Sequence, residues 1–148
     1  MILTPHMLLG AAIASKIGYA PLAIILAFLS HYLLDIVPHI EYPIKNIQNK
    51  WWAKSLPDFL RVALDFSAGI LIIYFFSGWQ IIIFAGALFS VLPDAFNLLN
   101  YVFPNNFLKN HSNFHEKIHF LKNKKISVFW RIASQVLVAV VSVAILKI

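Results

Sequence analysis

Five apolar segments constrain the fold of this chain more than any other feature of its sequence. They cover roughly residues 4–17, 21–37, 57–76, 79–103 and 127–146. A helix needs ~20 apolar residues to cross ~30 Å of hydrocarbon, and four of the segments approach or reach that length. Backbone polar groups inside a bilayer must be paired within the protein, which favours helices for such segments. The sequence therefore predicts an all-α integral membrane bundle of four to five transmembrane or re-entrant helices.

The composition supports this prediction and bounds the chain to one domain. Of 148 residues, 60% are hydrophobic and 12% are charged, whereas soluble domains are about 45–50% apolar and about 25% charged. No polar stretch is long enough to form a separate core, so we expect a single membrane domain over residues 1–148. The first segment is short for a span, and we expect it to be re-entrant, tilted or packed beneath the others. Cysteine is absent, which excludes disulfides and thiolate metal sites.

The basic residues predict the orientation of the bundle. Ten of the twelve Lys and Arg residues follow the second and fourth segments: Lys45, Lys50, Lys54, Arg61, Lys109, Lys117, Lys122, Lys124, Lys125 and Arg131. The positive-inside rule places these loops in the cytoplasm, as in a bacterial-type inner membrane. Residues 104–125 are predicted to form an interfacial segment there. The net charge of +6 is then explained by membrane lipids as partners, and no nucleic acid is expected.

Ionisable side chains inside the apolar segments converge on one depth below the cytoplasmic surface. At ~1.5 Å per residue, His31 lies ~10 Å deep, Asp65 ~12 Å and Asp94 ~13 Å. Asp35 is four residues after His31, so the two share a helix face. His6 begins the first segment near the same side. Four segments thus bring acid or imidazole groups to one layer.

A divalent cation would explain this layer. A lone Asp in a membrane helix costs about 2.5–3.5 kcal/mol on insertion scales, and a cation would keep the carboxylates ionised and bind the imidazoles. Four alternatives stay open. His6 could be an interfacial histidine with no partner. His31 and Asp35 could only staple two helices, Asp94 could cap a short helix after a break at Pro93, and Asp65 could orient a ligating histidine rather than bind metal.

The polar stretch after the fourth segment carries three histidines at i,i+4 spacing, His111, His115 and His119. They could be ligands, could bind a substrate phosphate together with Lys117, or could form a solvated face. His39 follows Pro38 at the interface and is equally open. The sequence contains no phosphate-binding glycine loop, no H-E-x-x-H and no G-x-S-x-G element.

Four short motifs resemble those of the YdjM-like group of small inner-membrane, metal-dependent hydrolases. They are "TPHMLLGAAIA" with His6, "SHYLLDIVPH" with His31, Asp35 and His39, "VLPDAFN" with Asp94, and "HEKIHF" with His115 and His119. The resemblance extends to about residue 120. It implies a metal-dependent hydrolase with its site at the cytoplasmic face.

Together, these observations predict a hydrolase of phosphoester or lipid-related substrates, with a divalent metal ion as cofactor. Zinc is the first choice because the ligands mix imidazole and carboxylate, and manganese or magnesium would fit if carboxylates dominate. The predicted metal ligands are His6, His31, Asp35, Asp94 and Asp65. The predicted catalytic groups are His115 and His119, and the predicted substrate-binding groups are His39, Lys117 and Arg61. The alternatives are a cation- or proton-conducting protein and a non-enzymatic scaffold with a polar helix-stapling layer.

Overall fold

The computed structural model describes residues 2–119 and 126–148, which form seven α-helices and one 3-10 turn, with no strand in this part of the chain. The elements are α1 Leu3–Lys16, α2 Ala20–Ile36, α3 Lys45–Gln48, η1 Trp52–Lys54, α4 Leu56–Ser77, α5 Ile81–Val102, α6 Asn106–Ile118 and α7 Val128–Lys147. The prediction of an all-α fold is confirmed. Each of the five apolar segments forms one helix, α1, α2, α4, α5 and α7.

Among the described residues, three helices are long and apolar enough to cross a membrane, namely α4, α5 and α7. This finding indicates a membrane protein. The helix α2 is apolar but has only 17 residues, so a count of four or five spans stays a prediction. The predicted interfacial segment contains α6, while residues 120–125, with the last three lysines of that segment, lie outside the described residues.

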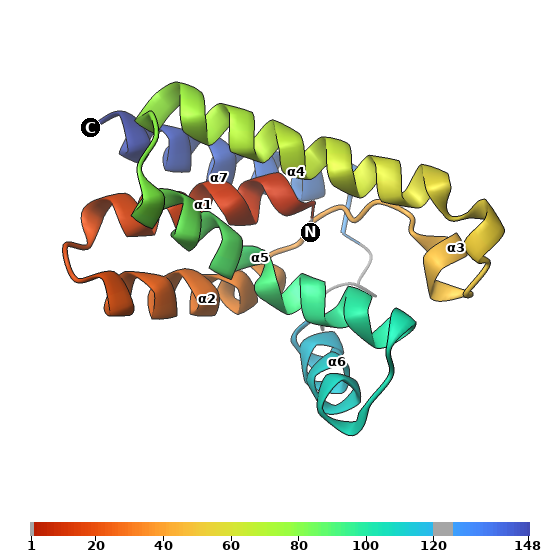
Figure 1. Ribbon diagram of the computed structural model, residues 1–148. Coiled ribbons are helices and arrows are strands. Elements are labelled where there is room, and N and C mark those ends of the chain that lie inside the picture. The colour runs from red at the N-terminus through yellow and green to blue at the C-terminus, as the bar shows by residue number, and fades with distance from the viewer. Residues whose placement is uncertain (1, 120–125) are drawn as a thin grey trace.

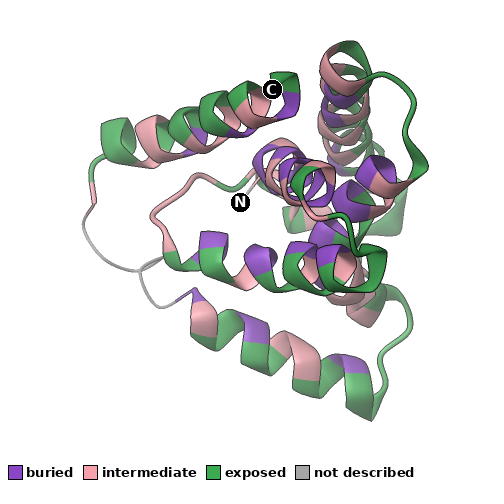
Figure 2. Ribbon diagram, turned by 90° about the vertical axis from the view of Figure 1, so that its left-hand side faces the viewer, coloured by how far each residue is buried: buried purple, intermediate pink, exposed green. Residues whose placement is uncertain are grey.

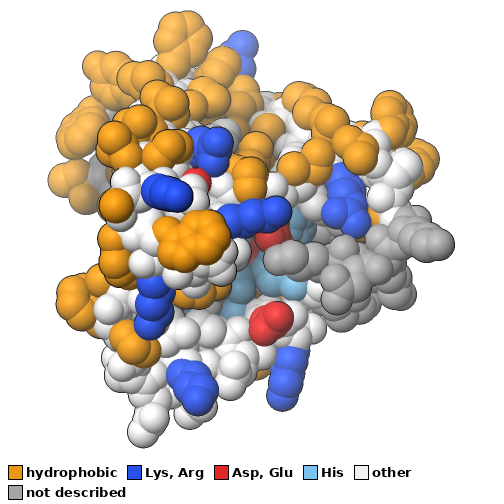
Figure 3. All heavy atoms as spheres, turned by 90° about the vertical axis from the view of Figure 1, so that its right-hand side faces the viewer, with side chains coloured by type: hydrophobic (Ala, Val, Ile, Leu, Met, Phe, Trp, Pro, Cys, Tyr) orange, Lys and Arg blue, Asp and Glu red, His pale blue; other side chains and the backbone are white. Residues whose placement is uncertain are grey.

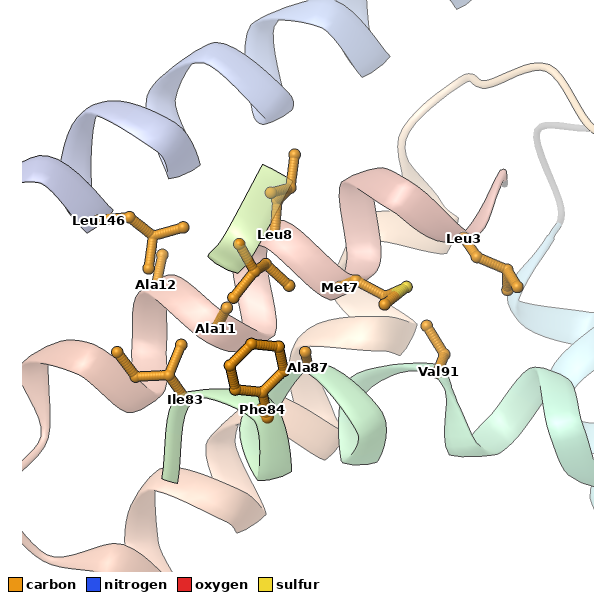
Figure 4. Packing of buried hydrophobic residues seen from close by; sticks show 11 residues of the cluster. Leu3, Met7, Leu8, Ala11, Ala12, Ile83, Phe84, Ala87, Val91 and Leu146 are labelled. Atoms are coloured by element: carbon orange, nitrogen blue, oxygen red, sulfur yellow. The ribbon is translucent and has the colours of Figure 1, made fainter. Parts of the chain in front are cut away.

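The short helix α1 occupies the centre of the bundle. It packs against α5, α2, α7 and α4, and in Figure 1 it lies between the α4–α7 pair and the α2–α5 pair. Met7 and Ala11 are fully buried in the core that α1 forms with α5, where they meet Phe84 and Ala87 (Figure 4). Figure 2 shows the buried residues gathered in these inner helices. Of the three expectations for the first segment, packing among the other helices is the one that the structure shows.

Small residues let α1 and α5 approach unusually closely. A Cβ atom added to Gly10 would lie 2.5 Å from the carbonyl oxygen of Gly86 and 2.5 Å from Cβ of Ser90. A Cβ atom added to Gly86 would lie 2.5 Å from Cβ of Ala14. The two helices therefore meet through small residues four apart, which is typical of helix contacts in membranes. At this contact the Ser90 hydroxyl donates to the carbonyl of His6 at 2.8 Å, which positions the start of α1.

Pro93 lies inside α5, which continues without a break from Ile81 to Val102. The alternative in which the helix ends at Pro93 and Asp94 caps a new helix is therefore wrong. A proline in a helix removes one backbone hydrogen bond, but α5 stays helical on both sides of it. Asp94 consequently projects from the middle of a continuous helix.

Candidate metal centre

The carboxylate of Asp35 is the centre of a buried cluster of histidines. Its Oδ2 atom lies 2.9 Å from Nε2 of His115, 3.0 Å from Nε2 of His31 and 3.3 Å from Nε2 of His119. Its Oδ1 atom lies 3.4 Å from Nε2 of His6. These side chains come from α1, α2 and the C-terminal end of α6, and all of them are buried. Residues far apart in the sequence thus surround one carboxylate.

Asp94 adds a second carboxylate to the cluster from α5. Its Oδ1 atom lies 3.7 Å from Nε2 of His31 and 3.6 Å from Nε2 of His115. The predicted convergence of α1, α2 and α5 on one layer is present in the structure. The i,i+4 spacing within α2 and at the end of α6 aims each pair of side chains at the same point.

Three overlapping groups of these side chains have ligand atoms within 4.8 Å of one another and could hold a metal ion. They are His6, His31 and Asp94, then His31, Asp35 and His115, then Asp35, His39 and His119. Mixed imidazole and carboxylate donors suit zinc, and also manganese. The chemistry of the donor set therefore fits a divalent ion without identifying it.

The second ring nitrogen of His31 supports a ligand role. Its Nδ1 atom lies 2.7 Å from the carbonyl oxygen of Ser90. Because a carbonyl can only accept, Nδ1 carries a proton, and in the neutral ring Nε2 presents a lone pair to the cluster. The ring of His6 stacks on that of His31 with centroids 4.1 Å apart, which fixes the plane of both imidazoles.

The cluster opens to one face of the molecule. A pocket of about 290 Å³ is lined by Asp94, His115 and His119, by the polar side chains of Asn97 and Ser112, and by apolar residues of α4 and α5. A second pocket of about 380 Å³ reaches Asp35 from the side of α7. Figure 3 shows the histidines in a hollow of this face, with lysine and arginine side chains around it.

Glu41 is a residue of the site that sequence reasoning missed. It lines both pockets, and its Oε1 atom lies 3.5 Å from Nε2 of His39 and 3.6 Å from Nδ1 of His119. It lies in the irregular segment after α2, where no periodicity marks it. The only signal was its place two residues after His39.

Asp65 lies apart from the three groups, although its predicted depth matched that of Asp94. Its carboxylate accepts hydrogen bonds from the hydroxyl of Thr4 at 2.6 Å and from the backbone N–H of Thr4 at 3.3 Å, and it also accepts from the backbone N–H of Leu3. It therefore satisfies the free N–H groups at the start of α1. Burial raises the pKa of the adjacent Tyr42 hydroxyl, and the charge of Asp65 adds to this.

Two predicted substrate-binding residues have other positions. Arg61 donates to Oδ1 of Asp58 at 3.1 Å and to the carbonyl of Pro43 at 3.2 Å. Asp58 also accepts from the backbone N–H of Asn46 at 2.9 Å, so this ion pair braces α3 against the start of α4. Lys117 is exposed on α6. His39 is the predicted substrate-binding residue that the structure brings to the cluster.

Comparisons of the chain with family models, with curated proteins and with solved structures gave no match. The function is therefore inferred from the site itself.

Proposed function

We propose that this chain is a membrane-embedded metal-dependent hydrolase that acts on phosphoester or lipid-linked substrates. The observation that carries the proposal is the buried carboxylate of Asp35 surrounded by imidazole nitrogen atoms. A buried charge is costly unless it is paired, and a divalent ion would pair with Asp35 and Asp94 together. The resemblance to the YdjM-like group supports the same proposal, with the basic loops in the cytoplasm and the chain in an inner membrane.

Helix stapling alone explains the cluster less well. Nε2 of His31 and Nε2 of His115 lie 3.0 Å apart, so at most one of them can direct a proton at the other. Since Nδ1 of His31 already carries the proton of that ring, its Nε2 lone pair points at the cluster. A staple in which Nε2 of His31 donates to Asp35, 3.0 Å away, needs a doubly protonated ring inside the buried cluster, whereas a metal ion binds the neutral ring. A bound cation would accept the lone pair of this ring and those of the carboxylates at once.

In this proposal, different residues bind the ion, transfer protons and contact the substrate. A bound ion would supply Lewis acidity and activate water for attack. His6, His31, Asp35 and Asp94 would hold it. His119 lies between Asp35 and Glu41, where its ring can move a proton between the cluster and the pocket. His115 is the second proposed catalytic group, facing the same pocket, and its Nε2 also belongs to the group with His31 and Asp35 that could hold the ion. The apolar and polar walls of that pocket suit an amphiphile, and the surrounding basic side chains favour an anionic headgroup.

The first experiment measures bound metal in detergent-purified, tag-free protein by elemental mass spectrometry. We expect near-stoichiometric metal in the wild type and in Asp65→Asn, and its loss in Asp35→Asn. Asp65→Asn is the matched control because it removes an intramembrane acid of similar depth that lies outside the cluster. Hydrolysis of p-nitrophenyl phosphate and of phosphatidic acid vesicles is then assayed with the metal-loaded protein.

Three results would contradict the proposal. Absence of metal after zinc and manganese are added back would leave helix stapling as the role of the cluster. Equal metal in both variants would place the site elsewhere. Metal binding without hydrolysis, but with metal-dependent ion flux in liposomes, would favour the conducting alternative.

A further inference from the structure

The helix α6 delivers His115 and His119 to the cluster, and polar side chains link it to α5 beside a few aromatic contacts. Leu108 is its one buried hydrophobic residue among those the structure describes. Between α5 and α6 runs a chain of hydrogen bonds. Asn97 Nδ2 lies 2.7 Å from Nδ1 of His115, the Ser112 hydroxyl donates to Oδ1 of Asn97 at 2.9 Å, and Asn100 Nδ2 donates to that hydroxyl at 3.2 Å.

The direction in which these hydrogen bonds donate, from Asn100 through Ser112 and Asn97, sets the tautomer of His115. An amide N–H₂ can only donate, so Nδ1 of His115 accepts from Asn97 and the proton of the ring is on Nε2. That proton points at Oδ2 of Asp35, 2.9 Å away. In this tautomer Nε2 has no lone pair for a metal ion. His31 differs, because the carbonyl of Ser90 keeps its Nε2 free.

The same chain can run in the opposite direction without moving either helix. Turning the Asn97 amide over brings its oxygen to Nδ1–H of His115 and its N–H₂ to the Ser112 hydroxyl. Ser112 then donates its proton to Asn100, whose amide turns over as well. In the present direction Oδ1 of Asn100 is buried and has no hydrogen-bond partner among the described residues. In the reversed direction the N–H₂ group takes that position, so each direction leaves one end of this amide unsatisfied.

We propose that Asn97, supported by Ser112 and Asn100, is a positioning residue that switches His115 from its hydrogen-bonding tautomer to its metal-binding tautomer. The inference rests on the proposed metal site. An amide suits this task because its two ends have nearly the same shape and opposite hydrogen-bonding character. Both directions keep the same three hydrogen bonds between the side chains of α5 and α6, and the reversed one frees Nε2 of His115 for an ion.

Zinc affinity, measured by competition with a chelator, tests the metal half of the proposal. Asn97→Leu removes both hydrogen bonds and should weaken zinc binding by about 10–100-fold, the usual effect of losing a group that orients a ligating histidine. Asn97→Asp should restore the affinity, because a carboxylate always accepts from Nδ1–H. Ser112→Ala is a milder break in the chain and covers the case in which Asn97→Leu does not fold. The matched control is Asn113→Ala, which replaces an exposed asparagine of α6 that takes no part in the hydrogen bonds between Asn97, Ser112 and Asn100.

The tautomer itself is read by nitrogen NMR of protein labelled with ¹⁵N-histidine, with the His115 signal assigned from His115→Gln. Metal-free wild type should carry the proton of His115 on Nε2, and Asn97→Asp should move it to Nδ1. Zinc should move it to Nδ1 in the wild type. His31 should keep its proton on Nδ1 throughout. A purely structural role of Asn97 would change none of these signals.

The outcomes separate this proposal from the proposed function. Zinc affinity in Asn97→Leu and Ser112→Ala equal to that of Asn113→Ala overturns the switch and leaves the hydrolase intact. An unchanged His115 tautomer in metal-free Asn97→Asp overturns it as well. Zinc binding that depends on Asn97, without hydrolysis of any phosphoester, overturns the hydrolase and leaves the switch. No zinc binding by the wild type overturns the proposed function and the metal half of the switch together.

Discussion

The helices α1 and α6 both bring histidines to Asp35, and they are held in place by different forces. In α1, nine of fourteen residues are buried, and its closest approach to α5 is made by glycine, alanine and serine. In α6, Phe107 is 68% exposed and Phe114 is 55% exposed. Figure 1 shows α6 at the edge of the molecule and α1 at its centre.

The comparison separates a part of the site that the core of the bundle holds in place, on α1, from a part whose position depends on the docking of α6. Close packing has one solution, because backbones that touch cannot shift without a clash. Hydrogen bonds between side chains can be exchanged for bonds to water. We therefore expect His6 to keep its place under all conditions in which the bundle is folded, and His115 to depend on the contacts of α6.

The largest effect is expected from Gly10→Val. The added methyl groups would overlap the backbone of α5, and overpacking of this kind costs about 3 kcal/mol or more at sites that cannot relax. Thermal unfolding in detergent should show a large loss of stability. Gly18→Val is the control, since an added Cβ there has nothing within 4 Å. Equal unfolding temperatures of the two variants would show that the α1–α5 contact does not hold the bundle.

A smaller and local effect is expected from Leu108→Ala. Removing a buried leucine costs about 2 kcal/mol or more, but here the loss should fall on the docking of α6. Amide hydrogen exchange should speed up in α6 and stay unchanged in α1. The exposed neighbour Lys109→Ala provides the comparison. Faster exchange throughout the bundle would mean that α6 is part of the core and not a separately stabilised element.

Asp65→Asn should weaken the start of α1 by about 1 kcal/mol, as the loss of a helix-capping group does. The amide keeps the shape of the side chain and one acceptor, so the helix should remain in place. The measurement is the unfolding temperature together with metal content. Loss of metal at an unchanged unfolding temperature would return Asp65 to the list of ligands.

The smallest effect is expected from acidic pH acting on His111. Burial lowers the pKa of this histidine, and the neighbouring His115 lowers it further; its Nε2 lies 3.0 Å from the hydroxyl of Tyr32. Because the folded-state pKa lies below the unfolded value of about 6.5, the neutral ring stabilises the fold above that value. This contribution is lost as the pH falls through the folded-state pKa.

Hydrogen exchange in α6, measured as a function of pH, checks this prediction. Exchange, corrected for its intrinsic pH dependence, should rise on acidification in the wild type, and His111→Gln should remove part of the rise. A rise of the same size in both proteins would assign the effect to other groups.

Much of this protein follows from local sequence. Runs of apolar residues predicted the helices, and i,i+4 spacing predicted that His31 and Asp35 act together. Depth along each helix predicted the layer in which the acids lie, because the rise per residue is constant. The choice between a solvated face and a ligand pair for His115 and His119 could not be made in this way, since spacing within α6 says nothing of what α6 packs against.

Asp65 and Asp94 show that the tertiary structure decided which carboxylate belongs to the candidate metal site. Their predicted depths were nearly equal, yet Asp94 faces the histidines while Asp65 binds the start of α1. Depth is one coordinate, and the other two depend on which helices are neighbours and how each is turned about its axis. For α5 these were decided by the close approach of Gly10 and Gly86, a contact between residues 76 positions apart, and for α4 by the contact of Gly69 with Met7. Long-range packing of small residues thus chose which of two similar carboxylates joined the site.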